Sequence, residues 1–159
     1  MSTPVKSRHL RPSTLNELGE RGAIDTEVTF ERIRLPLRIE IAFPEKFGEG
    51  AVNDIDMVLD NLNFVDSLGR ETIARGVNKQ GSTAAQLFRA WEQKKTVGWE
   101  NSTDDFIRDL KLTHIFIMPD GGIPIPDRVI STYQLSDSGA RGAIKVRFLE
   151  PLGPQLAPA

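Results

Sequence analysis

Carboxylates on one predicted helix are the residues with the clearest capacity for chemistry. Asp54, Asp56 and Asp60 lie within residues 51–65, where apolar residues recur every three or four positions. That period predicts an amphipathic helix, and the four-residue spacing of Asp56 and Asp60 puts them on one of its faces. Carboxylates in this arrangement can hold a divalent cation, transfer protons or bind a basic partner. No fixed ligand spacing marks them, so a solvated acidic helix face is the default interpretation.

A strong charge imbalance accompanies these carboxylates. Between residues 49 and 71 there are six acidic residues and one basic residue, Arg70, so the local charge is −5. A patch of this sign attracts a basic protein surface and repels nucleic acid. We therefore expect the partner to be another protein, and a basic toxin domain is one candidate.

Trp99 is a further candidate for partner binding. It lies in the polar segment Gly98-Trp-Glu-Asn101, where an aromatic side chain either folds back onto the core or anchors a partner. Trp91, in contrast, shares a helical face with apolar residues and is predicted to lie in the core. The predicted partner-binding residues are Asp54, Asp56, Asp60 and Trp99.

The residue types that most enzymes use as nucleophiles and metal ligands are scarce. The chain has no cysteine and two histidines, which excludes disulfides, thiolate catalysis and sulfur-bound metals. His114 begins an apolar run, a position typical of a partly buried histidine that bonds to a carbonyl group. Gly76 and Gly81 have the spacing of a phosphate-binding P-loop, but Ser82 stands where that motif requires lysine. We therefore predict no catalytic residue, no metal and no cofactor.

The hydropathy pattern predicts strands and helices in separate runs. Strands are expected at residues 28–33, 35–43, 114–118, 128–135 and 143–149. Three to four helices are expected between them, and Asp66 is predicted to cap the start of the second helix. This order, ββ-αααα-βββ, is typical of α+β proteins. We expect an antiparallel sheet of about five strands, with the helical insert packed on one face.

A single domain accounts for the length of the chain. Its 159 residues are too few for two domains of ordinary size. We expect a flexible basic tail at residues 1–24 with one helical turn near 15–20, and a single α+β domain at 25–149. A proline-rich, irregular tail is expected at 150–159. The N-terminal tail carries three basic residues, Lys6, Arg8 and Arg11, before its first acid, Glu17, so any contact with phosphates is weak and salt-dependent.

The composition is that of a soluble globular protein. Hydrophobic residues make up 39% of the chain, and the formal net charge is −2, which gives no overall attraction to nucleic acid or anionic membranes. No run approaches the roughly 18 apolar residues of a membrane span. The basic N-terminus is not followed by the apolar run of a secretory signal. We therefore expect a cytoplasmic protein without a membrane partner.

Several segments resemble a family of small bacterial α+β domains of unknown function. They are Val58–Asp66 with Arg70–Ile73, Asp104–Leu110, Ile115–Ile117, Tyr133–Leu135 and Ile144–Phe148. The resemblance covers residues 28–149. The chain departs from the family at residues 151–159, where the family tends to have a short acidic run. The resemblance implies no catalytic or ligand residues, and some members look like immunity proteins that bind and block a toxin.

These observations lead to one hypothesis and two alternatives. The leading hypothesis is a non-catalytic protein-binding module, specifically an immunity protein whose acidic helix covers basic groups at a toxin's active site. The first alternative is an assembly protein of a phage or secretion particle that docks through its ends. The second alternative is a hydrolase that uses the carboxylates, with or without a metal.

Overall fold

The structure is a computed structural model that describes residues 6–41, 44–94, 103–119, 129–135, 142–149 and 153–157. Six strands of the described chain form one sheet, in the order of their numbering. The strands are β1 (Ala23–Phe30), β2 (Ile33–Glu40), β3 (Leu110–Ile117), β4 (Val129–Leu135), β5 (Ala143–Leu149) and β6 (Gly153–Leu156). The α-helices are α1 (Pro12–Arg21), α2 (Glu49–Asp60), α3 (Leu62–Gly76), α4 (Thr83–Lys94) and α5 (Thr103–Asp109), and a 3-10 turn, η1, covers Pro44–Lys46.

The α+β class is confirmed, but the prediction of a purely antiparallel sheet is wrong. β2 and β3 are parallel, with Leu37 beside Ile115 and Ile39 beside Ile117, and the remaining neighbours are antiparallel. The chain passes through α2 to α5 between β2 and β3. A connection of this length acts as a crossover that returns the chain to the start of the neighbouring strand.

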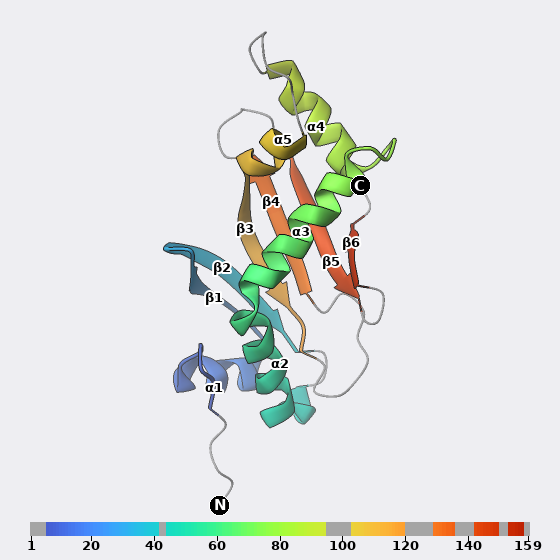
Figure 1. Ribbon diagram of the computed structural model, residues 1–159. Helices are drawn as coiled ribbons and strands as arrows, with labels where there is room; N and C mark the ends of the chain where they lie inside the picture. Colours follow the sequence, from blue (N-terminus) through green and yellow to red (C-terminus); the bar gives the residue numbers. More distant parts are fainter. Residues whose placement is uncertain are drawn as a thin grey trace, which may run out of the picture.

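Helix α3 lies across one face of the sheet and packs on β4, β5 and β6 (Figure 1). The strands bury alternate residues towards this side, as Ile144 and Val146 of β5 do, while Lys145 between them is exposed. At the upper end of the sheet, the rings of Phe88 and Trp91 of α4 pack against Phe106 of α5, with centroids 5.2 and 5.6 Å from that of Phe106. The core prediction for Trp91 is therefore confirmed.

The expected flexible tail at residues 1–24 is instead folded onto the domain from Leu10 onwards. Helix α1 begins with Pro12 in its first turn, where the missing N–H of proline is not needed. It ends at Gly22, whose positive φ of 77° allows its N–H to bond to Leu18 O. Leu10, Leu15 and Leu18 are buried in the main core. The hydrophobic burial of these leucines fixes the segment, so the described part of the region, from residue 6, is not a tail.

The expected irregular C-terminal segment contains a sixth strand. β6 pairs antiparallel with β5, and Pro154 lies opposite Phe148. β6 is an edge strand, where a proline can be accommodated because one side of the strand has no ladder to maintain. The strand packs beside α3, because Gly76 leaves the space that the Leu156 side chain occupies. The extra strand and the extra helix α1 account for the difference from the predicted order.

The predicted helix at residues 51–65 is divided at Asn61. The residue leaves helical geometry, with φ −115° and ψ 26°, and its side-chain amide donates to Met57 O over 2.7 Å. The prediction that Asp66 caps the start of a helix is therefore wrong. Asp66 lies in the second turn of α3. It is buried there and forms an ion pair with Arg70 at 3.1 Å. Sequence periodicity does not register this break, because the apolar stripe continues through it.

A buried polar group joins α3 to the sheet. The Tyr133 hydroxyl of β4 donates to Asp66 Oδ1 over 3.0 Å. Arg70 bonds to both carboxylate oxygens of Asp66 and also donates to the carbonyls of Ile107 and Leu110. Burial, and then the nearby Asp66 charge, raises the pKa of Tyr133 well above its ordinary value. These groups satisfy one another, which is the condition for keeping polar atoms in a core.

None of the helices in the described ranges combines the length and the hydropathy needed to cross a lipid bilayer.

Candidate protein-interaction surface

Asp56 was predicted to face solvent but is only 1% exposed. Its Oδ1 accepts a hydrogen bond from Ser7 Oγ at 2.5 Å, and its Oδ2 accepts one from the backbone N–H of Arg8 at 3.0 Å. A buried carboxylate requires such donors, because an unpaired charge in the interior is very costly. The N-terminal segment supplies them, and Asp56 is consequently not available to a partner.

Asp60 lies one turn further along α2 and binds the same N-terminal segment. The guanidinium of Arg8 forms an ion pair with Asp60 Oδ2, and His9 Nε2 lies 2.7 Å from Asp60 Oδ1. The hydrogen bond from Arg8, followed by that from His9, lowers the pKa of Asp60 below its ordinary value. The carboxylate therefore remains charged through the neutral and mildly acidic range.

Ser7 shapes the segment that carries these contacts. Its hydroxyl donates to Asp56 and accepts hydrogen bonds from the backbone N–H groups of His9 and Leu10, at 3.1 and 3.0 Å. This turn directs Leu10 into the core, where it is buried. We call residues 7–11 the N-terminal strap, because they run across α2 and are held at both polar and apolar points.

The strap changes the interpretation of the predicted partner-binding residues. The structure brings Asp56 and Asp60 together, as their spacing predicted, but under the chain's own strap. Asp54 is half-buried on the same helix, and Trp99 lies outside the described residues. One signal for this arrangement was present in the sequence, since Arg8 is basic and the helix is acidic. Which charges would pair was not predictable from the sequence.

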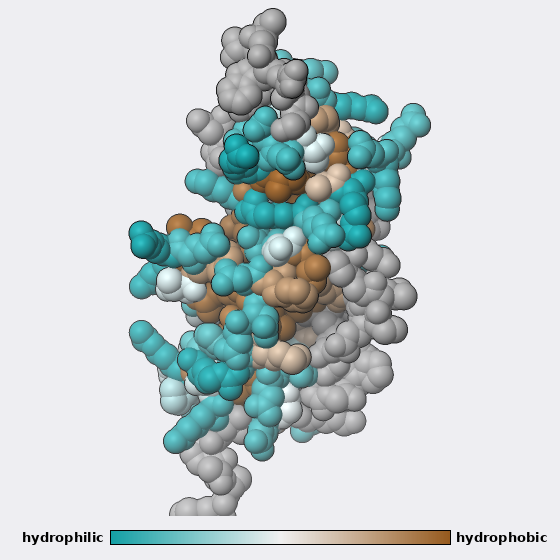
Figure 2. All heavy atoms as spheres, in the orientation of Figure 1, coloured by the Kyte–Doolittle hydropathy of each residue, from teal (hydrophilic) through white to brown (hydrophobic). Residues whose placement is uncertain are grey.

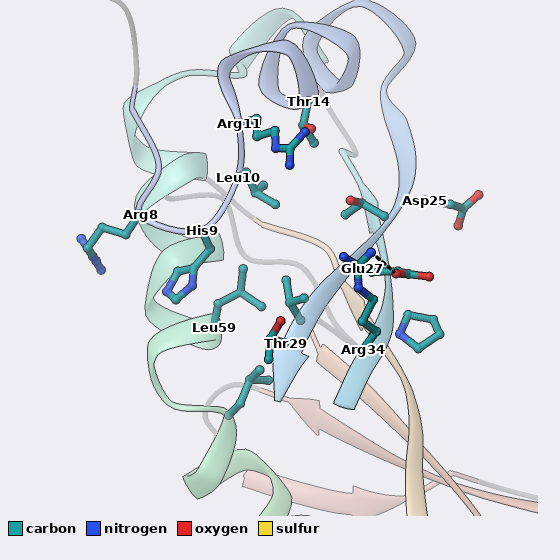
Figure 3. A pocket seen from close by; sticks show the side chains of 14 residues that line it. Arg8, His9, Leu10, Arg11, Thr14, Asp25, Glu27, Thr29, Arg34 and Leu59 are labelled. Carbon is teal, nitrogen blue, oxygen red and sulfur yellow. Dashed lines mark hydrogen bonds and ion pairs between the residues drawn. The ribbon is translucent and has the colours of Figure 1, made fainter. Parts of the chain in front are cut away.

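A cleft of about 930 Å³ opens between the strap and strand β1. Figure 3 shows Arg8 and His9 on one side, Glu27 and Thr29 of β1 on the other, and Leu10 and Leu59 between them. The cleft has charged walls, and the leucines form an apolar floor between them. None of the residues that line it was predicted to bind a partner. We call this feature the β1-edge cleft.

One edge of β1 runs along this cleft without a partner strand in the described chain. The β1–β2 hairpin turns through Glu31 and Arg32, whose φ angles of 48° and 70° define a two-residue primed turn. Such a turn makes Phe30 and Ile33 a hydrogen-bonded pair, and the alternation along the ladder then makes Glu27 and Pro36 a non-hydrogen-bonded pair. Pro36 fits this position because it has no N–H to donate.

The same alternation determines which backbone groups face the cleft. The N–H and C=O groups of Asp25, Glu27 and Thr29 point away from β2 and towards the open side. Asp25 and Glu27 also carry exposed side chains, 72% and 50% accessible, which pair across the hairpin with Arg38 and Arg34. Within the described ranges, the cleft therefore presents backbone groups without a strand partner beside two accessible carboxylates.

Two other features could bear on function. His114 lies in β3, and burial, rather than a neighbouring charge, is the main cause that lowers its pKa. Within the part of the chain that the structure describes, no three histidine, aspartate or glutamate residues are grouped closely enough to hold a metal ion.

Large apolar side chains also reach the surface. Met57 on α2 and Phe64 on the first turn of α3 are 50% and 64% exposed, on either side of the break at Asn61. Figure 2 shows hydrophobic residues gathered on the middle of the visible face, between hydrophilic regions above and below. Exposed aromatic and methionine side chains are the residues that partner proteins most often cover.

The fold and this surface define an α+β protein with an open sheet edge. Comparison of the chain with protein-family models, with curated proteins and with solved structures gives no match.

Proposed function

We propose that the chain is a cytoplasmic, non-catalytic protein-binding module, and that it acts as an immunity protein by occluding a bacterial toxin domain. The observation that carries the proposal is that the chain's own groups occupy the carboxylates best placed for chemistry. Asp56 accepts hydrogen bonds from Ser7 and Arg8, and Asp60 faces Arg8 and His9. Internal donors hold both carboxylates, and Asp56 is also buried, so a substrate or metal ion would have to compete with or displace these donors.

The contribution of the acidic helix to binding differs from the sequence-based hypothesis. A basic group of a partner must compete with Arg8 for Asp60, and it cannot reach Asp56 unless the strap leaves. Apolar contacts at Met57 and Phe64, and contacts along the β1-edge cleft, need no such displacement. We therefore assign the main binding role to these exposed surfaces and a secondary role to Asp60.

The proposal is tested with the products of the genes that flank this one. Each product is purified and titrated with the chain by calorimetry, and any flanking toxin is assayed for growth arrest with and without the chain. We expect one product to bind with micromolar or tighter affinity and growth to be restored. The double variant Met57→Ser with Phe64→Ser should weaken that binding. Ile33→Ser, at another exposed apolar residue, is the matched control.

Catalytic activity of the chain would contradict the proposal. Turnover of a small substrate that is abolished by Asp60→Asn or His114→Gln, without binding of any flanking gene product, would favour the hydrolase alternative. The assembly alternative has one observation in its favour, the open edge of β1, because such edges join chains into larger sheets. Light scattering distinguishes it, since a stable large oligomer favours assembly and a monomer favours the binding module.

A further inference from the structure

We propose that the β1-edge cleft binds an extended segment of a partner protein as an added strand, with basic side chains beside Asp25 and Glu27. This inference rests on the proposed protein-binding function and names the surface that performs it. Strand addition at an exposed sheet edge is a general mode of peptide recognition, in which backbone hydrogen bonds supply affinity and alternate side chains supply specificity.

The backbone of β1 is the first argument. The N–H and C=O groups of Asp25, Glu27 and Thr29, which have no strand partner among the described residues, face the cleft at every second residue, which is the pattern that a new strand requires. From Asp25 to Thr29 the strand extends about 14 Å, at roughly 3.4 Å per residue. The cleft therefore matches an occupant of five or six extended residues.

The side chains on the two faces of the cleft specify an alternating occupant. Inward residues of the added strand would meet Leu10, Leu59 and Leu62, which form the apolar floor. Outward residues would stand beside Asp25 and Glu27 as direct cross-strand neighbours. Opposite charges in such neighbouring positions are favourable. The occupant is therefore a segment in which apolar residues alternate with lysine or arginine.

Three arginines line the cleft; acids already hold two of them, and the third, Arg11, belongs to the strap and not to the edge of β1. Arg8 is held by Asp60, and Arg34 is held by Glu27 at 3.3 Å. Asp25 and Glu27, although paired with arginines on β2, remain largely accessible on the cleft side. An added strand lies next to these two carboxylates, and its outward side chains therefore meet negative charge first.

A second copy of the chain is a poorer occupant. Antiparallel pairing of β1 with itself, centred on Asp25, Thr26 or Glu27, places two acidic side chains directly opposite each other in every case. Like charges in that position destabilise a ladder. The acidic edge therefore discourages self-association and leaves the groups available to a basic strand.

The probe is a fluorescein-labelled heptapeptide in which lysine and valine alternate, followed by fluorescence anisotropy with the full chain. The matched control replaces every lysine with glutamate and should bind at least about tenfold more weakly, a difference of roughly 1.4 kcal/mol. Two further peptides carry N-methyl groups on either the lysines or the valines. Only one of these two peptides should lose binding, namely the one whose N-methyl groups replace the N–H groups that pair with β1. Which peptide loses binding shows whether the added strand is antiparallel or parallel to β1.

The matching protein variant is Thr29→Pro. It removes an N–H that faces the cleft while leaving the β1–β2 ladder and the charges of the edge intact. We expect a loss of about fivefold or more in peptide affinity, which corresponds to at least one backbone hydrogen bond. Thr29→Val keeps the N–H and should bind as the wild type does. Thermal unfolding of both variants establishes that the fold is retained.

Several outcomes would overturn the inference. They are equal binding of the lysine and glutamate peptides, full binding of both N-methylated peptides, or a dimer through β1 in light scattering. If a flanking gene product binds and Thr29→Pro binds it as tightly as the wild type, the inference fails while the protein-binding function stands. If no flanking product binds but the lysine peptide does so with the expected sensitivity to Thr29→Pro, the immunity function fails while the strand-addition site stands.

Discussion

The hydroxyl of Tyr133 on β4 donates a hydrogen bond to the carboxylate of Asp66 on α3 over 3.0 Å, across 67 residues of sequence. Asp66 simultaneously receives Arg70, which also donates to the carbonyls of Ile107 and Leu110 at the junction of α5 and β3. One buried carboxylate thus joins the helical layer to two regions of the sheet. The polar atoms of this arrangement bond to one another within the core and link its elements.

Tyr133→Phe is expected to destabilise the protein by about 1–3 kcal/mol, the usual cost of leaving a buried polar group with a lost partner. Urea unfolding monitored by tryptophan fluorescence measures the change. Thr132→Val, at the half-buried neighbouring residue of β4, is the control and should have a smaller effect. A loss below about 0.5 kcal/mol for Tyr133→Phe would mean that the hydrogen bond to Asp66 contributes little.

Gly69→Ala should destabilise the protein although alanine favours helix by about 1 kcal/mol over glycine. An added Cβ at residue 69 would lie 2.3 Å from Tyr133 Oη, so the helix and the strand must separate. The double variant Gly69→Ala with Tyr133→Phe removes the closest contact and should lose less stability than the sum of the single variants. Full additivity in urea unfolding would contradict the predicted contact.

Asp56→Ala should release the strap and cost about 1–3 kcal/mol of unfolding free energy, because Ser7 and the Arg8 amide lose their buried acceptor. Faster tryptic cleavage after Lys6 and Arg8 reports the release. Asn53→Ala changes an exposed residue of the same helix and is the control. Unchanged cleavage in Asp56→Ala would show that Leu10 holds the strap without the carboxylate.

Detachment of the strap at low pH follows from the lowered pKa of Asp60. The pKa of this carboxylate is depressed in the folded state, so the ion pair with Arg8 contributes fully above the ordinary value of 3.8 and is lost as the pH falls through the depressed pKa. The amide resonance of Arg8, followed by NMR from pH 7 to 2, should change with a midpoint below 3.8. In Arg8→Gln the Asp60 resonances should titrate at a higher pH, and an unaltered midpoint would contradict the assigned cause.

Local patterns were sufficient for much of the fold. Alternation at Leu35, Leu37 and Ile39, and again at Ile144 and Val146, predicted strands that the structure contains. These predictions hold because each depends on a period of two or 3.6 residues that the backbone itself imposes. The same argument predicted helices on both sides of Asn61 and the α+β class, although not the break itself.

Tertiary contacts decided the rest. The parallel pairing of Leu37 with Ile115 depends on the path of the chain through α2 to α5, which no local period encodes. Arg8 and Asp60 have opposite charges in the sequence, but their contact depends on the burial of Leu10, Leu15 and Leu18, which carries the N-terminal segment to α2. The sequence by itself therefore determined the elements and the sign of their charges. Only folding decided that the acidic helix is covered by the strap and that the open edge of β1 is available, because burial and strand order are properties of the whole chain.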